Sequence, residues 1–334
     1  MVWILIFILS LALLVKSADW LIESSEKIGL AFKIPPFIIG VTIVAIGTSL
    51  PELASSIMAT LKGATEIVTA NAIGSNIANI LLILGLTAIA ARTLVVKRSL
   101  IDLDSPLLGI TTFLFIFIMW DKKVVFGEGI IFILGFLIYL LYTIFHKEEE
   151  ENLDGFEVLS SRLENKRKST EKRKESQLNF KVFFLLILGM IGLTVGSNYT
   201  ISSMMKISEF LNISSSLIAI TALAIGTSLP ELIVSLKAAI NKKYEIALGN
   251  IFGSNIFNIL LVVGIPALIK PLVVSDITFN IGLPFLAVST VLFIISGISK
   301  KIHIWEGIMY LLLYFHQIPP HQQVMPFLPV LPCQ

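Results

Sequence analysis

The sequence predicts an all-α membrane protein with ten transmembrane helices, arranged as two inverted five-helix repeats. Of the 334 residues, 55% are hydrophobic and 14% are charged, whereas soluble domains carry roughly 25% charged residues. Apolar runs of about 20 residues recur along the chain, and each is long enough to cross a hydrocarbon layer about 30 Å thick. A long internal repeat is the third observation. These features argue against a water-soluble enzyme, and we expect no enzymatic activity.

The expected spans follow from the apolar runs and the polar breaks between them. They are 2–26, 36–61, 67–91, 105–120, 125–145, 180–205, 215–240, 246–269, 277–298 and 304–318. A strongly charged segment with too little apolar content to form a core separates the first five from the last five. The predicted organisation is a first five-helix repeat over 1–145, a charged cytoplasmic loop over 146–178, a second repeat over 179–318 and a Pro-rich tail over 319–334.

Lysine and arginine predict the orientation of the chain, because short cytoplasmic loops carry an excess of them. With the N-terminus outside, the inner short loops hold nine of these residues and the outer ones five. The loop at 146–178, with its eight basic residues, also falls inside. We therefore expect a multi-pass protein of the cell membrane, functioning as a monomer. Nucleic acid is not an expected partner, since no basic stripe stands out beyond this loop.

The internal repeat is visible when the chain is aligned with itself at an offset of 179 residues. Between 42–85 and 221–264, 24 of 44 aligned positions are identical, without a gap. Each half contains five expected spans, an odd number, so the second copy should lie upside down relative to the first. Inverted repeats are typical of secondary transporters, whose binding sites lie near mid-membrane where the repeats meet.

The motif AIGTSLPEL occurs in both copies of the repeat and places polar side chains on one face of an apolar helix. The residues of this face are Ala45, Thr48, Ser49 and Glu52 in the first copy, and Ala224, Thr227, Ser228 and Glu231 in the second. A glutamate at bilayer depth is costly, so two at equivalent positions indicate function. The structural alternative is that a motif glutamate forms an ion pair with Lys237 or Lys16.

Pro51 and Pro230 predict a break in each motif helix, because proline lacks an N–H and its ring presses on the carbonyl one turn back. Carbonyl oxygens near Gly47 and Gly226 would then be free beside a carboxylate. Within a membrane such groups must be satisfied, and a bound cation satisfies both. The motif therefore predicts a cation site.

The next expected helix of each half adds neutral oxygen ligands at helical spacing. They are Asn71, Ser75 and Asn79 in the first half, and Asn250, Ser254 and Asn258 in the second. If the two repeats meet, Glu52 and Glu231 face each other. The carbonyls of Thr48 and Thr227 would lie between them. Two bidentate carboxylates and two carbonyls supply about six oxygens, which suits Ca²⁺ better than Mg²⁺. No nearby histidine or thiolate favours zinc, copper or iron.

These residues resemble the sodium/calcium exchangers of the cation/calcium antiporter superfamily. The resemblance rests on GTSLPE at 47–52 and 226–231 and on GSN at 74–76 and 253–255, and it covers nearly all of 1–318. It implies that Ca²⁺ is held by Glu52, Glu231 and the carbonyls of Thr48 and Thr227. It also implies Na⁺ sites built from the same groups with Ala45, Ser49, Ser75, Ala224, Ser228 and Ser254, and with Asn79 and Asn258 near the centre. The first and sixth helices would slide past the others.

The sequence thus predicts a secondary antiporter that exchanges Ca²⁺ for Na⁺ at one shared site by alternating access, without a cofactor. One alternative is proton-coupled calcium exchange, in which protons compete for the two neighbouring carboxylates. Another is a passive cation channel that uses the same ring of oxygens. The chain departs from the family pattern at Asn258, where some members carry aspartate, and this leaves the ion stoichiometry open.

Overall fold

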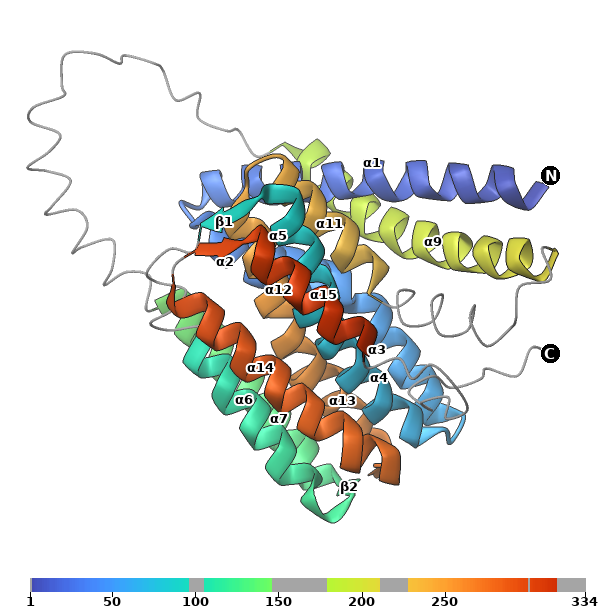
Figure 1. Cartoon of the computed structure of the whole chain (residues 1–334), viewed down its shortest axis with the longest axis vertical. Helices are drawn as coiled ribbons and strands as arrows, with labels where there is room; N and C mark the ends of the chain where they lie inside the picture. Colours follow the sequence, from blue (N-terminus) through green and yellow to red (C-terminus); the bar gives the residue numbers. More distant parts are fainter. Residues whose placement is uncertain (1, 96–104, 146–178, 211–227, 300, 317–334) are drawn as a thin grey trace, which may run out of the picture.

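The computed structural model describes residues 2–95, 105–145, 179–210, 228–299 and 301–316, which are almost entirely helical (Figure 1). In the first half these residues form α1 (Val2–Ala31), α2 (Pro36–Ile39), the π-helical segment η1 (Gly40–Val44), α3 (Ala45–Leu61), α4 (Thr65–Ile77), the π-helical segment η2 (Ala78–Ile83), α5 (Leu84–Ala91), strand β1 (Thr93–Val95), α6 (Ser105–Ile118), the 3-10 segment η4 (Met119–Asp121), strand β2 (Lys123–Val124) and α7 (Phe126–Phe145).

The second half repeats this order at the 179-residue offset. Its elements are α9 (Phe180–Phe210), α11 (Leu229–Ile240), α12 (Tyr244–Phe257), the π-helical segment η5 (Asn258–Val262), α13 (Gly264–Ile269), strand β3 (Leu272–Val273), the π-helical segment η6 (Thr278–Gly282), α14 (Leu283–Ile298), strand β4 (Lys301–His303) and α15 (Ile304–His316). The all-helical class is therefore confirmed. Within the described chain, seven helices are long and apolar enough to cross a membrane.

The number of ten spans stays a prediction, as does the inverted relation of the halves. The expected span 215–240 is described only from residue 228 onwards, and α15 is described to His316. The predicted loop at 146–178 and the tail at 319–334 lie outside the described residues. Where the chain is described, the expected span boundaries agree with the observed helices to within about five residues.

The two halves pack against each other through equivalent elements. Helix α1 runs alongside its counterpart α9, and α6 packs against its counterpart α14. Helix α15 of the second half covers α5 of the first, and α7 of the first half covers α13 of the second. Each half therefore completes the other, so neither half is a separate domain in its packing.

Two short antiparallel strand pairs, which the sequence analysis did not predict, also join the halves. Strand β1 pairs with β4, aligning Thr93 with His303, and β2 pairs with β3, aligning Lys123 with Val273. At the 179-residue offset β1 corresponds to β3, and β2 corresponds to β4. The two pairs are therefore equivalent, and they lie toward opposite ends of the molecule (Figure 1).

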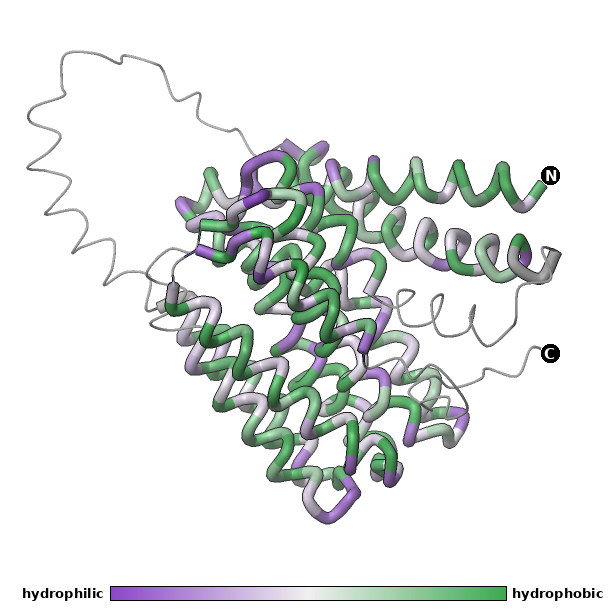
Figure 2. The backbone as a smooth tube through the Cα atoms, viewed as in Figure 1, coloured by the Kyte–Doolittle hydropathy of each residue, from purple (hydrophilic) through white to green (hydrophobic). Residues whose placement is uncertain are grey.

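The core is formed by the third expected span of the first half and its counterpart. For the spans Thr65–Ala91 and Tyr244–Ile269, 83% of the apolar window is buried, compared with 22% for α1. Helix α1 instead exposes apolar side chains such as Trp3 and Leu5. Apolar residues cover the helices and polar residues concentrate toward their ends (Figure 2). This distribution suits a protein whose outer helices face lipid.

Candidate ion-binding site

The two motif glutamates meet in the interior of the structure. Glu52 in α3 and Glu231 in the first turn of α11 are each 1% exposed. Ser49 lies one turn before Glu52, and its hydroxyl donates a hydrogen bond of 2.8 Å to Oε1 of Glu231. Because Ser49 and Glu52 lie on consecutive turns of α3, this bond holds the Glu231 side chain against the part of α3 that carries Glu52. The site therefore takes one acidic side chain from each half.

Helix α12 supplies polar side chains to the same region. The Thr48 hydroxyl donates to Oδ1 of Asn250 at 3.1 Å and lies 3.5 Å from the Ser254 hydroxyl. Nδ2 of Asn250 donates to the Ser235 hydroxyl at 2.9 Å. The predicted stripe on the second helix of the motif region thus faces the motif helices, as its spacing indicates.

Several buried polar atoms at this site have no hydrogen-bond partner within the described chain. They are both carboxylate oxygens of Glu52, Oε2 of Glu231, the Ser228 hydroxyl, Oδ1 and Nδ2 of Asn79 and Oδ1 of Asn258. The segment η2, which contains Asn79, packs against α11, and η5, which contains Asn258, packs against α3. Leaving a buried polar group unpaired costs about 1–3 kcal/mol, and more when it is charged. A cation at this position would relieve that cost for the oxygens, although not for the amide nitrogen of Asn79, which is a donor.

The remaining predicted site residues are placed only in part. Ala45 begins α3 and is 0% exposed, and Ser75 in α4 is 4% exposed. Ala224 and Thr227 lie outside the described residues. In the part of the chain that the structure describes, no three His, Cys, Asp or Glu side chains cluster as a metal site. The donor set is therefore two carboxylates with hydroxyl and amide oxygens, which matches hard cations rather than transition metals.

The π-helical segments at the site were not predicted. Asn79 lies in η2, and Asn258 begins η5. A π-helical turn adds one residue to a helix and shifts the side chains that follow it, and such turns frequently occur at functional sites. Both sequences, ANILLI and NILLV, are ordinary apolar helix formers, so no local signal marks the change.

The expected helix breaks differ between the two copies. Helix α3 runs from Ala45 to Leu61 through Pro51, so the break expected there is wrong, and the irregular segment η1 ends before the motif begins. In the second copy, α11 begins at Leu229 and Pro230 lies in its first turn. Proline is favoured there because the first N–H groups of a helix have no partner within the helix.

The structural alternative for the motif glutamates is also wrong for Lys237. Its ammonium group lies 2.6 Å from Oδ2 of Asp19 and donates to the Val15 carbonyl at 2.8 Å. Lys16 lies over the ring of Trp20. Neither lysine forms an ion pair with Glu52 or Glu231 among the recorded contacts of the described residues.

Comparison with known proteins identifies the family of this chain. Residues 2–145 and 181–318 match the family model described as sodium/calcium exchanger protein, so the match spans both halves and leaves out only the charged loop and the tail. The chain belongs to the sodium/calcium exchanger family. The predicted resemblance is confirmed, and the protein is a membrane transporter of the antiporter type, not an enzyme.

Several known proteins are similar to this chain over most of their length. The sodium/calcium exchanger MaX1 of Methanosarcina acetivorans is 32% identical, covering 93% of this chain and 95% of that protein. The inner membrane protein YrbG of Escherichia coli is 33% identical over 82% of each protein. A solved structure of the sodium-calcium exchanger NCX_Mj, soaked with Na⁺ and Ca²⁺, has a TM-score of 0.78 and 32% identity, covering 97% of this chain and 99% of that one.

Proposed function

We propose that the protein exchanges Ca²⁺ for Na⁺ at a single site between its two halves. The observation that carries this proposal is the meeting of Glu52 and Glu231, both buried, with the Ser49 hydroxyl bonded to Glu231. Ca²⁺ would be held by these two carboxylates with the carbonyls of Thr48 and Thr227. Na⁺ would use the same groups with Ala45, Ser49, Ser75, Ala224, Ser228 and Ser254, and with Asn79 and Asn258 near the centre.

Coupling of the two ions follows from competition for the same oxygens. Two glutamates and the neutral Asn79 and Asn258 give the empty site a charge of −2, which one Ca²⁺ neutralises. An empty site with this charge resists crossing a region of low dielectric, because unpaired charge is costly there. Ca²⁺ and a full set of Na⁺ ions cannot occupy the same oxygens together. Only states with ions bound would then change access, so the gradient of one ion would drive transport of the other.

The change of access is proposed to involve α1 and α9. These two helices lie side by side and are less buried than the core spans, so they can slide with a small change in buried contacts. We further propose that the N-terminus lies outside, that the 146–178 loop lies in the cytoplasm, and that the protein moves Ca²⁺ outward as a monomer in the cell membrane. The excess of lysine and arginine in the proposed inner loops supports this orientation.

Calcium flux into lipid vesicles tests the exchange directly. Purified protein is reconstituted, the vesicles are loaded with Na⁺, and uptake of radioactive Ca²⁺ is measured after dilution into Na⁺-free buffer. We expect uptake that disappears when the vesicles are loaded with choline. Uptake driven equally well by a pH gradient without Na⁺ would favour proton-coupled exchange. Conductance that does not depend on any counter-ion gradient would favour a channel.

Two substitutions test the site within the same assay. Glu52→Gln and Glu231→Gln each remove one charge while keeping the side-chain shape, so we expect either one to abolish Ca²⁺ flux. An unchanged unfolding temperature in detergent is the control for folding. Robust Ca²⁺ flux by either variant would contradict the assignment of the site.

A further inference from the structure

Asn250 joins elements from both halves of the protein through one side chain. It lies in α12 and is 0% exposed. Its Oδ1 accepts a hydrogen bond of 3.1 Å from the Thr48 hydroxyl in α3. Its Nδ2 donates to the Ser235 hydroxyl at 2.9 Å and to the Glu231 main-chain carbonyl at 3.4 Å, both in α11. Asn250 therefore connects the Thr48 segment to the helix that carries Glu231.

The amide group is well suited to hold these two segments at a set spacing. Its donor and acceptor lie in one plane, so both bonds form only when α3 and α11 keep one relative position. The network is buried, where hydrogen bonds are stronger than in water and unpaired groups are costly. A change in the spacing of Thr48 and Glu231 would break at least one of these bonds.

The equivalent residue in the first half makes no such connection. Asn71 corresponds to Asn250 at the 179-residue offset, and none of the recorded hydrogen bonds of the described chain involves it. Ser56 corresponds to Ser235, and its buried hydroxyl has no partner within the described residues. Among the described residues the link is therefore formed by Asn250, while Thr227, the residue equivalent to Thr48, lies outside the described residues.

We infer that Asn250 is a positioning residue that sets the distance between the Thr48 carbonyl and the Glu231 carboxylate, and thereby the size of the cation that the site accepts. This inference rests on the proposed function, in which both groups are ligands. Ca²⁺ binds oxygen at about 2.3–2.6 Å, and a larger ion such as Ba²⁺ needs a wider cage. Losing the link lets the two segments separate, so it weakens Ca²⁺ binding and lowers the preference for Ca²⁺ over Ba²⁺.

The experiment measures half-saturation for Ca²⁺ and for Ba²⁺ in Na⁺-loaded vesicles. Asn250→Ala should raise the half-saturating Ca²⁺ concentration about tenfold, because the buried hydrogen bonds of its side chain are lost, and change that for Ba²⁺ less than about twofold. Thr48→Val removes the hydroxyl, keeps the carbonyl, and should weaken Ca²⁺ binding in the same direction. Thr48→Ser keeps the hydroxyl and should weaken Ca²⁺ binding less than Thr48→Val does. Asn71→Ala, at the equivalent position, should leave the preference for Ca²⁺ over Ba²⁺ unchanged.

Combining the substitutions separates positioning from general weakening. In the Asn250→Ala background, Thr48→Val should have a smaller effect on Ca²⁺ half-saturation than in the unchanged protein, because its bond to Asn250 is already absent and only its contacts with the Ala45 carbonyl and the Ser254 hydroxyl remain. Three results would each overturn the inference. They are effects of the two substitutions that multiply, equal losses of affinity for Ca²⁺ and Ba²⁺, and a Thr48→Ser variant that binds Ca²⁺ as weakly as Thr48→Val does. If Asn250→Ala does not fold, the contrast between Thr48→Val and Thr48→Ser decides alone. Absence of Na⁺-driven Ca²⁺ flux in the unchanged protein would instead contradict the proposed function.

Discussion

The two copies of the AIGTSLPEL motif have the same sequence but different surroundings in the folded chain. Glu231 accepts a hydrogen bond from Ser49, whereas both carboxylate oxygens of Glu52 have no partner among the described residues. Equal sequences therefore support unequal arrangements, which is what a transporter needs to open toward one side at a time. The differences between equivalent residues indicate which contacts belong to the present arrangement and which belong to the fold in general.

The largest expected difference concerns the glycine of the GSN motif. A Cβ added at Gly253 would overlap the Val41 carbonyl and lie 2.6 Å from Cβ of Ala45, so α12 could no longer lie this close to η1 and α3. At the equivalent Gly74, no atom of the described chain lies within 4 Å of such a Cβ. We expect Gly253→Ala to lower the free energy of unfolding by about 1–3 kcal/mol or more, and Gly74→Ala to lower it less.

Thermal unfolding in detergent, followed by loss of monodisperse protein on size-exclusion chromatography, measures this difference. Calcium flux should follow the same order, since α12 carries the proposed ligand Ser254 and the positioning residue Asn250. Equal destabilisation by the two substitutions would mean that both copies pack the motif glycine equally closely. The asymmetry drawn from Gly253 would then be incorrect.

The second comparison concerns the motif serines. The Ser49 hydroxyl donates to the Glu231 carboxylate, whereas the buried hydroxyl of the equivalent Ser228 has no hydrogen-bond partner within the described chain. In Ca²⁺-free and Na⁺-free buffer, Ser49→Ala should lower the free energy of unfolding by about 1.5–3 kcal/mol, because it leaves a buried carboxylate oxygen unpaired. Ser228→Ala removes an unpaired group and should have little effect. A larger loss of stability for Ser228→Ala than for Ser49→Ala would contradict this difference between the two serines.

The comparison also indicates what the sequence could and could not predict. Apolar run length placed the ends of the span Pro36–Leu61 and of α7 to within one residue, and the offset of 179 residues relates the equivalent helices that the structure describes. Helical spacing brought Glu52 and Ser49 to one face. The π-helical segments around Asn79 and Asn258 and the pairing of β1 with β4 depend on contacts between the halves, and a local pattern does not report such contacts.

Asn250 illustrates the same limit within the site. Its spacing from Ser254 predicted that it lies on the polar face of its helix, and the structure agrees. Its partners Thr48 and Ser235 lie far away in the sequence or on another helix, so its connecting role could not be predicted. The equivalent Asn71 has the same sequence context and no recorded hydrogen bond in the described chain. Local sequence therefore predicts where a side chain can point, and packing between the halves decides what it contacts.

Helices α1 and α9 provide a third comparison, because α1 forms two ion pairs with residues of the other half. Asp19 lies 2.6 Å from Lys237, and Glu26 lies 2.6 Å from Lys243. The residues equivalent to these four are uncharged: Asn198, Met58, Met205 and Ala64. Since α1 and α9 are the proposed sliding helices, these ion pairs would stabilise the present arrangement over the opposite one.

Replacing Lys237 by methionine, the residue found at the equivalent position, tests this effect. The paired groups are partly exposed, so Lys237→Met should lower the free energy of unfolding by no more than about 1 kcal/mol. The more informative quantity is the ratio of Ca²⁺ half-saturation on the two faces, measured in inside-out and right-side-out vesicles. This ratio should move toward 1 as the two arrangements become closer in energy. An unchanged ratio would mean that the ion pair does not distinguish them.

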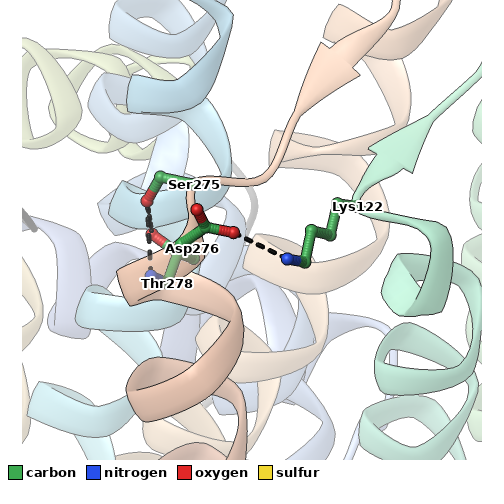
Figure 3. Close-up of polar contacts among 4 residues, drawn as sticks. All are labelled: Lys122, Ser275, Asp276 and Thr278. Carbon is green, nitrogen blue, oxygen red and sulfur yellow. Dashed lines mark hydrogen bonds and ion pairs between the residues drawn. The ribbon is translucent and has the colours of Figure 1, made fainter.

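The smallest expected effect concerns the loop that joins β2 to the rest of the first half. Lys122 donates to Oδ1 of Asp276 at 2.6 Å, next to the Ser275 and Thr278 hydroxyl contact (Figure 3). The hydrogen bond and the positive charge of Lys122 lower the pKa of Asp276 below its ordinary value of 3.8. At the 179-residue offset, Lys122 corresponds to Lys301 and Asp276 to Lys97, so the equivalent sequence positions hold two lysines instead of an oppositely charged pair. Lys97 lies outside the described residues.

Because the pKa of Asp276 is lowered in the folded state, the ion pair stabilises the fold above the unfolded value of 3.8 and is lost as the pH falls through the lower folded value. Both side chains are exposed, so salt screens the interaction and the contribution is small. Lys122→Met should lower the unfolding temperature slightly at pH 7 and low salt, and not at all at high salt. Lys301→Met, at the equivalent position, should raise it or leave it unchanged, because the sequence equivalent of Asp276 is a lysine and offers no oppositely charged partner. A loss of stability for Lys301→Met as large as that for Lys122→Met would show that the two ends do not differ in this way.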